Sequence, residues 1–165
     1  MSFKSVVLTA VAAVSLAVPA FAGSIMINDA YARSSGASAK SGAAFMTIMN
    51  KGSEDDRLVS ATSNIARKVE THTHIEAENG VMQMREVEGG FVIPAGESYH
   101  LARGGDHLMF MGLNGPMVQD QKVTVTLTFE KAGEMVVEIP VDLKRKPMMK
   151  MDHSKMKMKM KKASE

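Results

Sequence analysis

Hydrophobic and polar residues alternate strictly along residues 123–129, where every second position is apolar and the positions between are threonines. This period of two predicts a half-buried antiparallel strand. A second apolar run at 135–141 follows the short turn at 131–133, so the sequence predicts a β-hairpin here. The apolar side of its first strand consists of Val123, Val125, Leu127 and Phe129.

The rest of the chain up to residue 143 repeats this design of short apolar runs between turns. Turn signals rich in Gly, Asn and Pro lie at 79–80, 89–90, 94–96, 104–105 and 114–116. The further candidate strands are residues 25–33, 43–49, 58–63, 68–74, 91–93, 99–101 and 108–111. There is no convincing amphipathic helix and no long internal repeat. Some eight to ten short strands separated by turns predict an all-β sandwich or barrel.

Residues 1–22 have the pattern of a secretory signal peptide. The positive charge of Lys4 precedes an apolar run at 6–18, and Ala20 and Ala22 form a small-x-small cleavage site. A membrane-spanning helix needs about 20 apolar residues, which is more than this run contains. We therefore expect export to the periplasm, with the signal peptide cleaved near Ala22.

Composition and charge divide the remaining chain into two parts. The 165 residues include no cysteine, which excludes disulfides, thiolate metal sites and thiol nucleophiles within them. Residues 23–143 hold 10 Lys or Arg and 16 Asp or Glu, a formal charge of −6. Residues 144–165 hold 9 basic and 2 acidic residues, a charge of +7. We expect a folded domain at 23–143 and a flexible Met/Lys-rich tail at 144–165, because dense like charges favour an extended chain.

Methionine and histidine are the unusual feature of the composition, with 16 Met among few aromatic residues. In the folded part they recur at strand spacing, at 72–74, 82–84 and 107–111. Residues two apart share one face of a strand, so neighbouring strands would bring imidazoles and thioethers together. A thioether is a soft, neutral donor that suits Cu(I) and poorly suits Mg²⁺, Ca²⁺ or Mn²⁺. A single Met more often packs in the core than binds a metal. The joint occurrence of His-x-His, Met-x-Met and His-x-Met at strand spacing is what favours a metal site.

The residues at 69–72, 79–85, 93–96, 104–113 and 127–130 resemble the periplasmic copper chaperones of the PCuAC family, and the resemblance extends over residues 25–141. It implies an all-β, cupredoxin-like Greek-key β-sandwich with a disordered C-terminal tail. The family motif is a His, a Met about a dozen positions later, and a His-x-Met some twenty positions beyond. Carried onto this sequence, it implies that the Cu(I) ligands are His72, Met84, His107 and Met109, with His74 as a competing first ligand.

The resemblance implies extracytoplasmic Cu(I) binding and delivery, towards copper-site assembly in cytochrome c oxidase. The implied partner is a copper-recipient protein such as an oxidase subunit or another copper chaperone, with no nucleic acid. We expect no enzymatic activity, because no catalytic triad or metalloprotease motif stands out and the motif lacks the Cys thiolate of blue-copper sites.

Further candidate ligands lie beside this motif and in the tail. They are Met82, Met111, Met148, Met149, Met151, His153, Met156, Met158 and Met160. The tail methionines suggest a weak second arm for further Cu(I), or for Cu(II) through His153. The alternative is a solvated basic extension that at most contacts a membrane surface peripherally.

Two other functions fit the same pattern. One is a β-sandwich adhesion or assembly module whose methionines form a contact surface, which predicts metal-independent partner binding. The other is copper storage or detoxification instead of delivery. Copper titration separates the first of these from a metal carrier.

Overall fold

The computed structural model describes residues 24–77 and 80–146, and these ranges contain ten β-strands and no helix. The strands are β1 (Ile25–Ser34), β2 (Ser41–Asn50), β3 (Asp56–Ser63), β4 (Ala66–Glu76), β5 (Met82–Glu86), β6 (Phe91–Ile93), β7 (Ser98–Leu101), β8 (His107–Leu113), β9 (Lys122–Phe129) and β10 (Gly133–Pro140). Nine of them contain or overlap a run that the hydrophobic pattern singled out, and β5 contains the Met-x-Met segment at 82–84. The all-β prediction is therefore confirmed.

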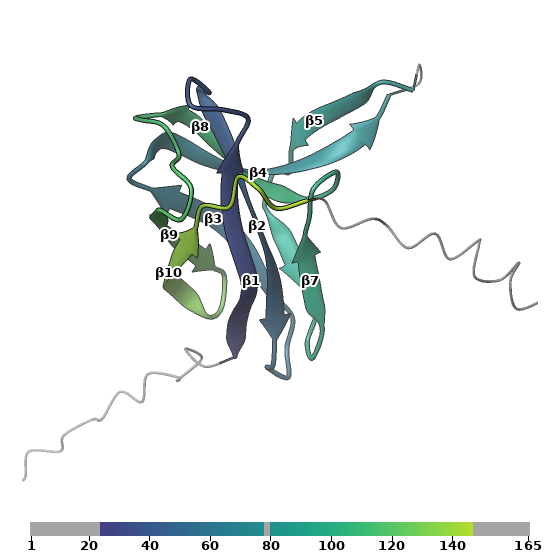
Figure 1. The fold of residues 1–165 in the computed structure, drawn as a ribbon. Coiled ribbons are helices and arrows are strands. Elements are labelled where there is room, and N and C mark those ends of the chain that lie inside the picture. The colour runs from purple at the N-terminus through teal and green to yellow at the C-terminus, as the bar shows by residue number, and fades with distance from the viewer. Residues whose placement is uncertain (1–23, 78–79, 147–165) are drawn as a thin grey trace, which may run out of the picture.

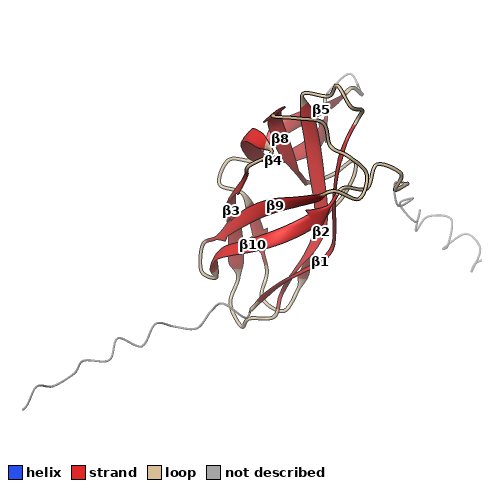
Figure 2. Ribbon diagram, turned by 60° about the vertical axis from the view of Figure 1, so that its left-hand side comes forward, coloured by secondary structure: helices blue, strands red, loops and turns tan. Residues whose placement is uncertain are grey.

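The strands form one sheet that folds back on itself into a nearly closed sandwich (Figures 1 and 2). The order is β1-β2-β8-β4-β3-β9-β10, while β5 pairs with β4, β6 with β3 and β7 with β2. A parallel bridge from Ala32 to Val141, just beyond β10, brings the two ends of this order together. Neighbours that are distant in sequence, such as β2 and β8, show that crossover connections build the fold.

The core follows from the alternation along β9. Val123, Val125, Leu127 and Phe129 are all at most 2% exposed, and the predicted hairpin pairs Phe129 with Gly133. Gly133 has φ +77°, a conformation that glycine adopts without steric cost, and it begins β10 after the tight turn. Burying each large apolar side chain contributes about 1.5–3 kcal/mol, so this strand contributes strongly to the stability of the sandwich.

The strand that matters most for the candidate site is β4. It lies between β8 and β3 in the sheet, and its C-terminal half also pairs with β5. All five residues of β5 are exposed, and the β4–β5 hairpin projects away from the sandwich in Figure 1. The hairpin therefore extends the surface of the sheet beside β8, where the His-x-Met segment lies.

Two predicted segments fall largely or wholly outside the described residues: the signal peptide at 1–22 and the Met-rich part of the tail from residue 147 onward. Within the described ranges, no helix is long and apolar enough to cross a membrane.

Candidate metal centre

Strand register brings the sequence-predicted ligands together. His72 on β4 lies opposite His107 on β8, and two residues further along β4, His74 lies opposite Met84 on β5. Met109 follows His107 on the same face of β8, while Leu108 between them is completely buried on the other face. Three strands that are separate in the sequence thus supply imidazole and thioether groups to one region.

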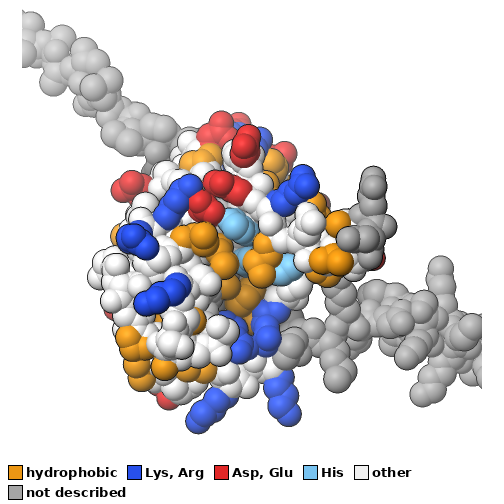
Figure 3. Space-filling model, turned by 90° about the horizontal axis from the view of Figure 1, so that it is seen from above, with side chains coloured by type: hydrophobic (Ala, Val, Ile, Leu, Met, Phe, Trp, Pro, Cys, Tyr) orange, Lys and Arg blue, Asp and Glu red, His pale blue; other side chains and the backbone are white. Residues whose placement is uncertain are grey.

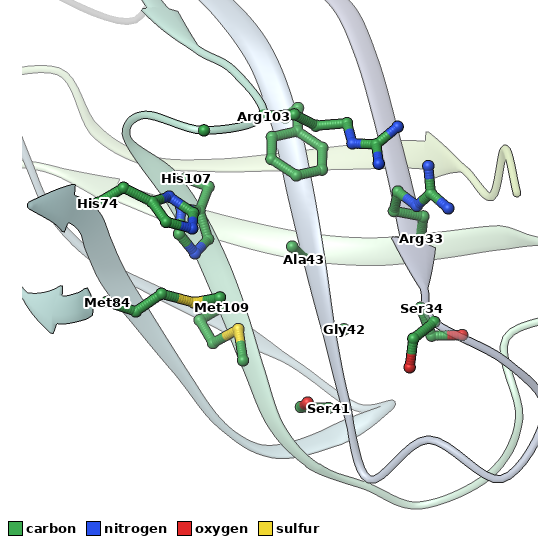
Figure 4. Close-up of a pocket in the computed structure, with 13 residues that line it drawn as sticks. Arg33, Ser34, Ser41, Gly42, Ala43, His74, Met84, Arg103, His107 and Met109 are labelled. Carbon is green, nitrogen blue, oxygen red and sulfur yellow. The ribbon is translucent and has the colours of Figure 1, made fainter. Parts of the chain in front are cut away.

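Four of these side chains line one cavity of about 390 Å³. The four are His74, Met84, His107 and Met109, and Figure 4 shows them gathered on one side of it. Arg33, Arg103 and Ser34 lie on the other side in the same view. Seen from above in Figure 3, the histidines lie in a hollow among hydrophobic side chains, with basic side chains along one edge and acidic ones along another.

The orientation of two of the imidazoles is set by a single backbone group. The Nδ1 atoms of His74 and His107 donate hydrogen bonds to the carbonyl oxygen of Gly105, at 3.1 and 2.9 Å. A carbonyl oxygen only accepts, so both rings carry their proton on Nδ1. In the neutral form each ring therefore keeps a lone pair on Nε2, the atom that remains free to bind a metal.

His107 is held in the neutral form by its surroundings. It is 2% exposed, and burial lowers its pKa below the ordinary value because the charged ring would lose its hydration. The nearby His74 and His72 act in the same direction, whereas the bond to Gly105 and the charge of Asp106 act against it. A neutral imidazole is the form that coordinates metals.

His72 is placed differently from His74. It does not line the cavity, although its ring centroid lies 5.9 Å from that of His107. Its Nε2 atom donates to Glu70 at 2.6 Å, while its Nδ1 atom is buried without a hydrogen-bond partner. Glu70 also pairs with Lys68. The hydrogen bond from Lys68 lowers the pKa of Glu70 most, and the bond from His72 lowers it further.

The other candidates on these strands lie outside the cavity. Met82 and Met111 are 54% and 38% exposed and do not line it. His100 does not line the cavity either, and its Nδ1 atom is hydrogen-bonded to Thr47 on β2. The arginines and serines of the opposite wall were not predicted, because no sequence motif marks them. They come to the cavity through the pairing of β1 with β2 and of β2 with β8.

The wall formed by His74, Met84, His107 and Met109 has the donor chemistry of a candidate soft-metal site. Among the described residues, no group of three or more His, Asp or Glu is placed to hold a metal ion. Zn²⁺ sites are normally built from His, Cys and carboxylate ligands. A metal bound here would have to use the methionine sulfurs, and thioethers favour Cu(I).

Solved structures with this fold include copper-binding domains. The copper-bound PCuAC domain from PmoF2 superposes with a TM-score of 0.62 at 22% identity, over 74% of this chain and 95% of that one. The solution structure of Cu(I)-DR1885 from Deinococcus radiodurans gives 0.58 at 28% identity, over 76% of this chain and 84% of that one. These similarities confirm the β-sandwich fold and the expected resemblance to PCuAC proteins.

Sequence comparison assigns the family. A family model described as "Putative lipoprotein LpqE-like" matches residues 25–141. The "Putative lipoprotein Lxx21020" of Leifsonia xyli subsp. xyli is 38% identical over 120 residues, which cover 73% of this chain and 70% of that protein. The chain belongs to the LpqE-like family.

Proposed function

We propose that this protein is an exported carrier that binds one Cu(I) ion in its folded domain and delivers it to another protein. The observation that carries the proposal is the convergence of two imidazoles and two thioethers from β4, β5 and β8 on one cavity. The copper-bound state of the similar PCuAC structures supports it.

We propose that three of the four Cu(I) ligands are His107, Met109 and Met84. For the fourth donor we favour His74, because it lines the same cavity and its Nε2 is free. His72, the residue that the family motif implies, is the alternative donor through its buried Nδ1. All these ligands are neutral, so a monovalent ion is bound without a compensating buried anion. Copper is the cargo of this site, and we propose no catalytic turnover.

Delivery is favoured over storage by the exposure of the site. Met84 is 53% exposed on the projecting β4–β5 hairpin. A ligand at the surface can be replaced by a ligand of the recipient in an exchange reaction, whereas a fully enclosed ion would be released slowly. We propose a copper-site protein as recipient, with the assembly of cytochrome c oxidase as the destination that the PCuAC resemblance implies.

Export is supported by the signal-peptide pattern and by the lipoprotein descriptions of the family and of the 38% identical relative. We propose that the protein acts in the periplasm.

The Met-rich tail from Met148 to Met160 is proposed as a weaker second copper-binding arm, because its six methionines and His153 exceed what a basic extension requires.

A competition titration with a Cu(I) chelator tests the function. We expect one tightly bound Cu(I) in a chain that ends at Lys146, which keeps every described contact of Arg145, and additional weaker binding in the full chain. The quadruple variant H74A/M84L/H107A/M109L should lose the tight site. Equal Cu(I) affinity in the quadruple variant and in the unmodified chain would contradict the proposal. Copper-independent capture of a partner would favour the adhesion alternative.

A further inference from the structure

The wall of the cavity that faces the metal ligands is positively charged and lacks acidic groups. Arg33 on β1 and Arg103, in the turn before β8, line it together with three serines. None of the cavity-lining residues is Asp or Glu. This is unexpected in a domain whose residues 23–143 carry a formal charge of −6. The serines are Ser34, Ser35 and Ser41.

The two guanidinium groups are held close together by one backbone oxygen. Each donates an Nη1–H bond of 3.3 Å to the carbonyl oxygen of Arg145, in the segment that crosses over β1 after β10 (Figure 1). Arg145 is itself fixed, since its guanidinium pairs with Asp29 and lies 4.2 Å from the centroid of the Tyr31 ring. The C-terminal segment thus fixes Arg33 and Arg103 at the edge of the cavity.

The charge of Arg145 is compensated by Asp29, whereas the charges of Arg33 and Arg103 are not compensated by a carboxylate of the described residues. Within residues 24–77 and 80–146, no carboxylate lies within ion-pair distance of Arg33 or Arg103. Arg33 is half-buried and shares its cavity with the proposed ligands. Like charges in a partly desolvated site repel one another, and a bound cation would increase this repulsion. An anion in the cavity would relieve it.

We propose that Arg33 and Arg103 form a carboxylate-binding subsite beside the metal ligands. A guanidinium offers a planar pair of N–H donors that matches the two oxygens of a carboxylate. The hydroxyls of Ser35 and Ser41 add further donors, whereas that of Ser34 donates to the carbonyl oxygen of Gly36. The carboxylate comes either from a free organic acid or from an acidic side chain of the protein that exchanges copper with this one. Only the second source rests on the proposed function.

The subsite is tested first without copper, with succinate as the probe and its neutral diamide succinamide as the control. NMR of the apo full-length chain should show saturable shifts of the Arg33 and Arg103 side-chain N–H signals with succinate and none with succinamide. The R33Q/R103Q variant should weaken succinate binding at least about tenfold, as expected for loss of charge-assisted hydrogen bonds. R103Q alone should weaken it less, and this exposed position provides a second variant if the double variant unfolds.

A matched control removes the same charge outside the cavity. R57Q/R67Q should bind succinate like the unmodified chain, because neither arginine lines this cavity. Equal weakening in the control, or the same shifts with succinamide, would overturn the subsite. Because this experiment contains no copper, its failure leaves the copper-carrier proposal intact.

The two sources are separated by copper exchange with a synthetic Met-x-Met peptide that carries a flanking Asp, and with its Asn analogue. If a partner side chain occupies the subsite, the Asp peptide takes Cu(I) faster than the Asn peptide, and R33Q/R103Q abolishes the difference. Equal rates together with succinate binding assign the subsite to a free acid. Absence of succinate binding and equal rates would overturn the proposal.

Discussion

His74 and His107 donate hydrogen bonds to the same carbonyl oxygen, that of Gly105, although they lie on different strands. Their ring centroids are 5.1 Å apart. One backbone group in the turn before β8 therefore fixes the tautomer of both rings and leaves an Nε2 lone pair on each. Both rings are thus oriented by the same hydrogen-bond acceptor.

Met109 is the proposed thioether ligand on β8. M109L should lower Cu(I) affinity by more than about tenfold, because it removes one of four donors while keeping a similar side-chain volume. M111L is the matched control, since Met111 lies two residues further along β8 and outside the cavity. Competition titration measures both variants, and equal losses would contradict the assignment.

A second prediction separates the two histidines of β4. H74A should reduce Cu(I) affinity more strongly than H72A, because His74 lines the cavity and Nε2 of His72 is engaged by Glu70. The measurement is again Cu(I) competition, with circular dichroism to verify folding. A larger loss in H72A would assign the fourth donor to the buried Nδ1 of His72.

The pH dependence of stability should report the buried His107. Its pKa is lowered in the folded protein, mainly by burial, so the unfolded chain takes up the proton first as the pH falls. The free energy of unfolding of the apo protein should therefore decrease as the pH drops below about 6.5, until the folded-state pKa is reached. Urea unfolding at several pH values measures this.

H107L supplies the comparison for that measurement. The decrease in stability between neutral pH and pH values below about 6.5 should be smaller in this variant, because the group that resists protonation is gone. An equal or larger decrease in H107L would show that other groups cause the effect.

Asp56 should be essential for stability and irrelevant to copper. Its buried carboxylate accepts hydrogen bonds from the backbone N–H groups of Arg57, Lys131 and Ala132, at 2.7, 2.9 and 3.0 Å. D56A leaves these donors without their partner, which should cost about 2–4 kcal/mol. Thermal or urea unfolding measures the loss, and Cu(I) affinity of the folded fraction should be unchanged.

The neighbouring Asp55 is the control for this substitution. It accepts a single exposed hydrogen bond, from the backbone N–H of Ala95, so D55A should cost less than about 1 kcal/mol. Similar losses in D55A and D56A would mean that the three hydrogen bonds accepted by Asp56 do not carry the effect.

The sequence was sufficient to predict nine of the ten strands, because positions such as the core residues of β9 follow the period of two, whereas β5 is exposed along its whole length. Within the folded domain it narrowed the candidate donors to seven His and Met residues. It did not distinguish His72 from His74, since both lie on the same face of β4 and only the hydrogen bonds to Glu70 and Gly105 separate them. Arg33 and Arg103 were not predicted, because their position depends on crossover connections and on the carbonyl of Arg145.

The most direct test of the account is X-ray absorption at the copper edge on the Cu(I)-loaded chain that ends at Lys146. We predict both sulfur and nitrogen scatterers in the first coordination shell, with the sulfur contribution reduced by M109L and unchanged by M111L. A shell of nitrogen and oxygen alone would contradict the proposed histidine–methionine site.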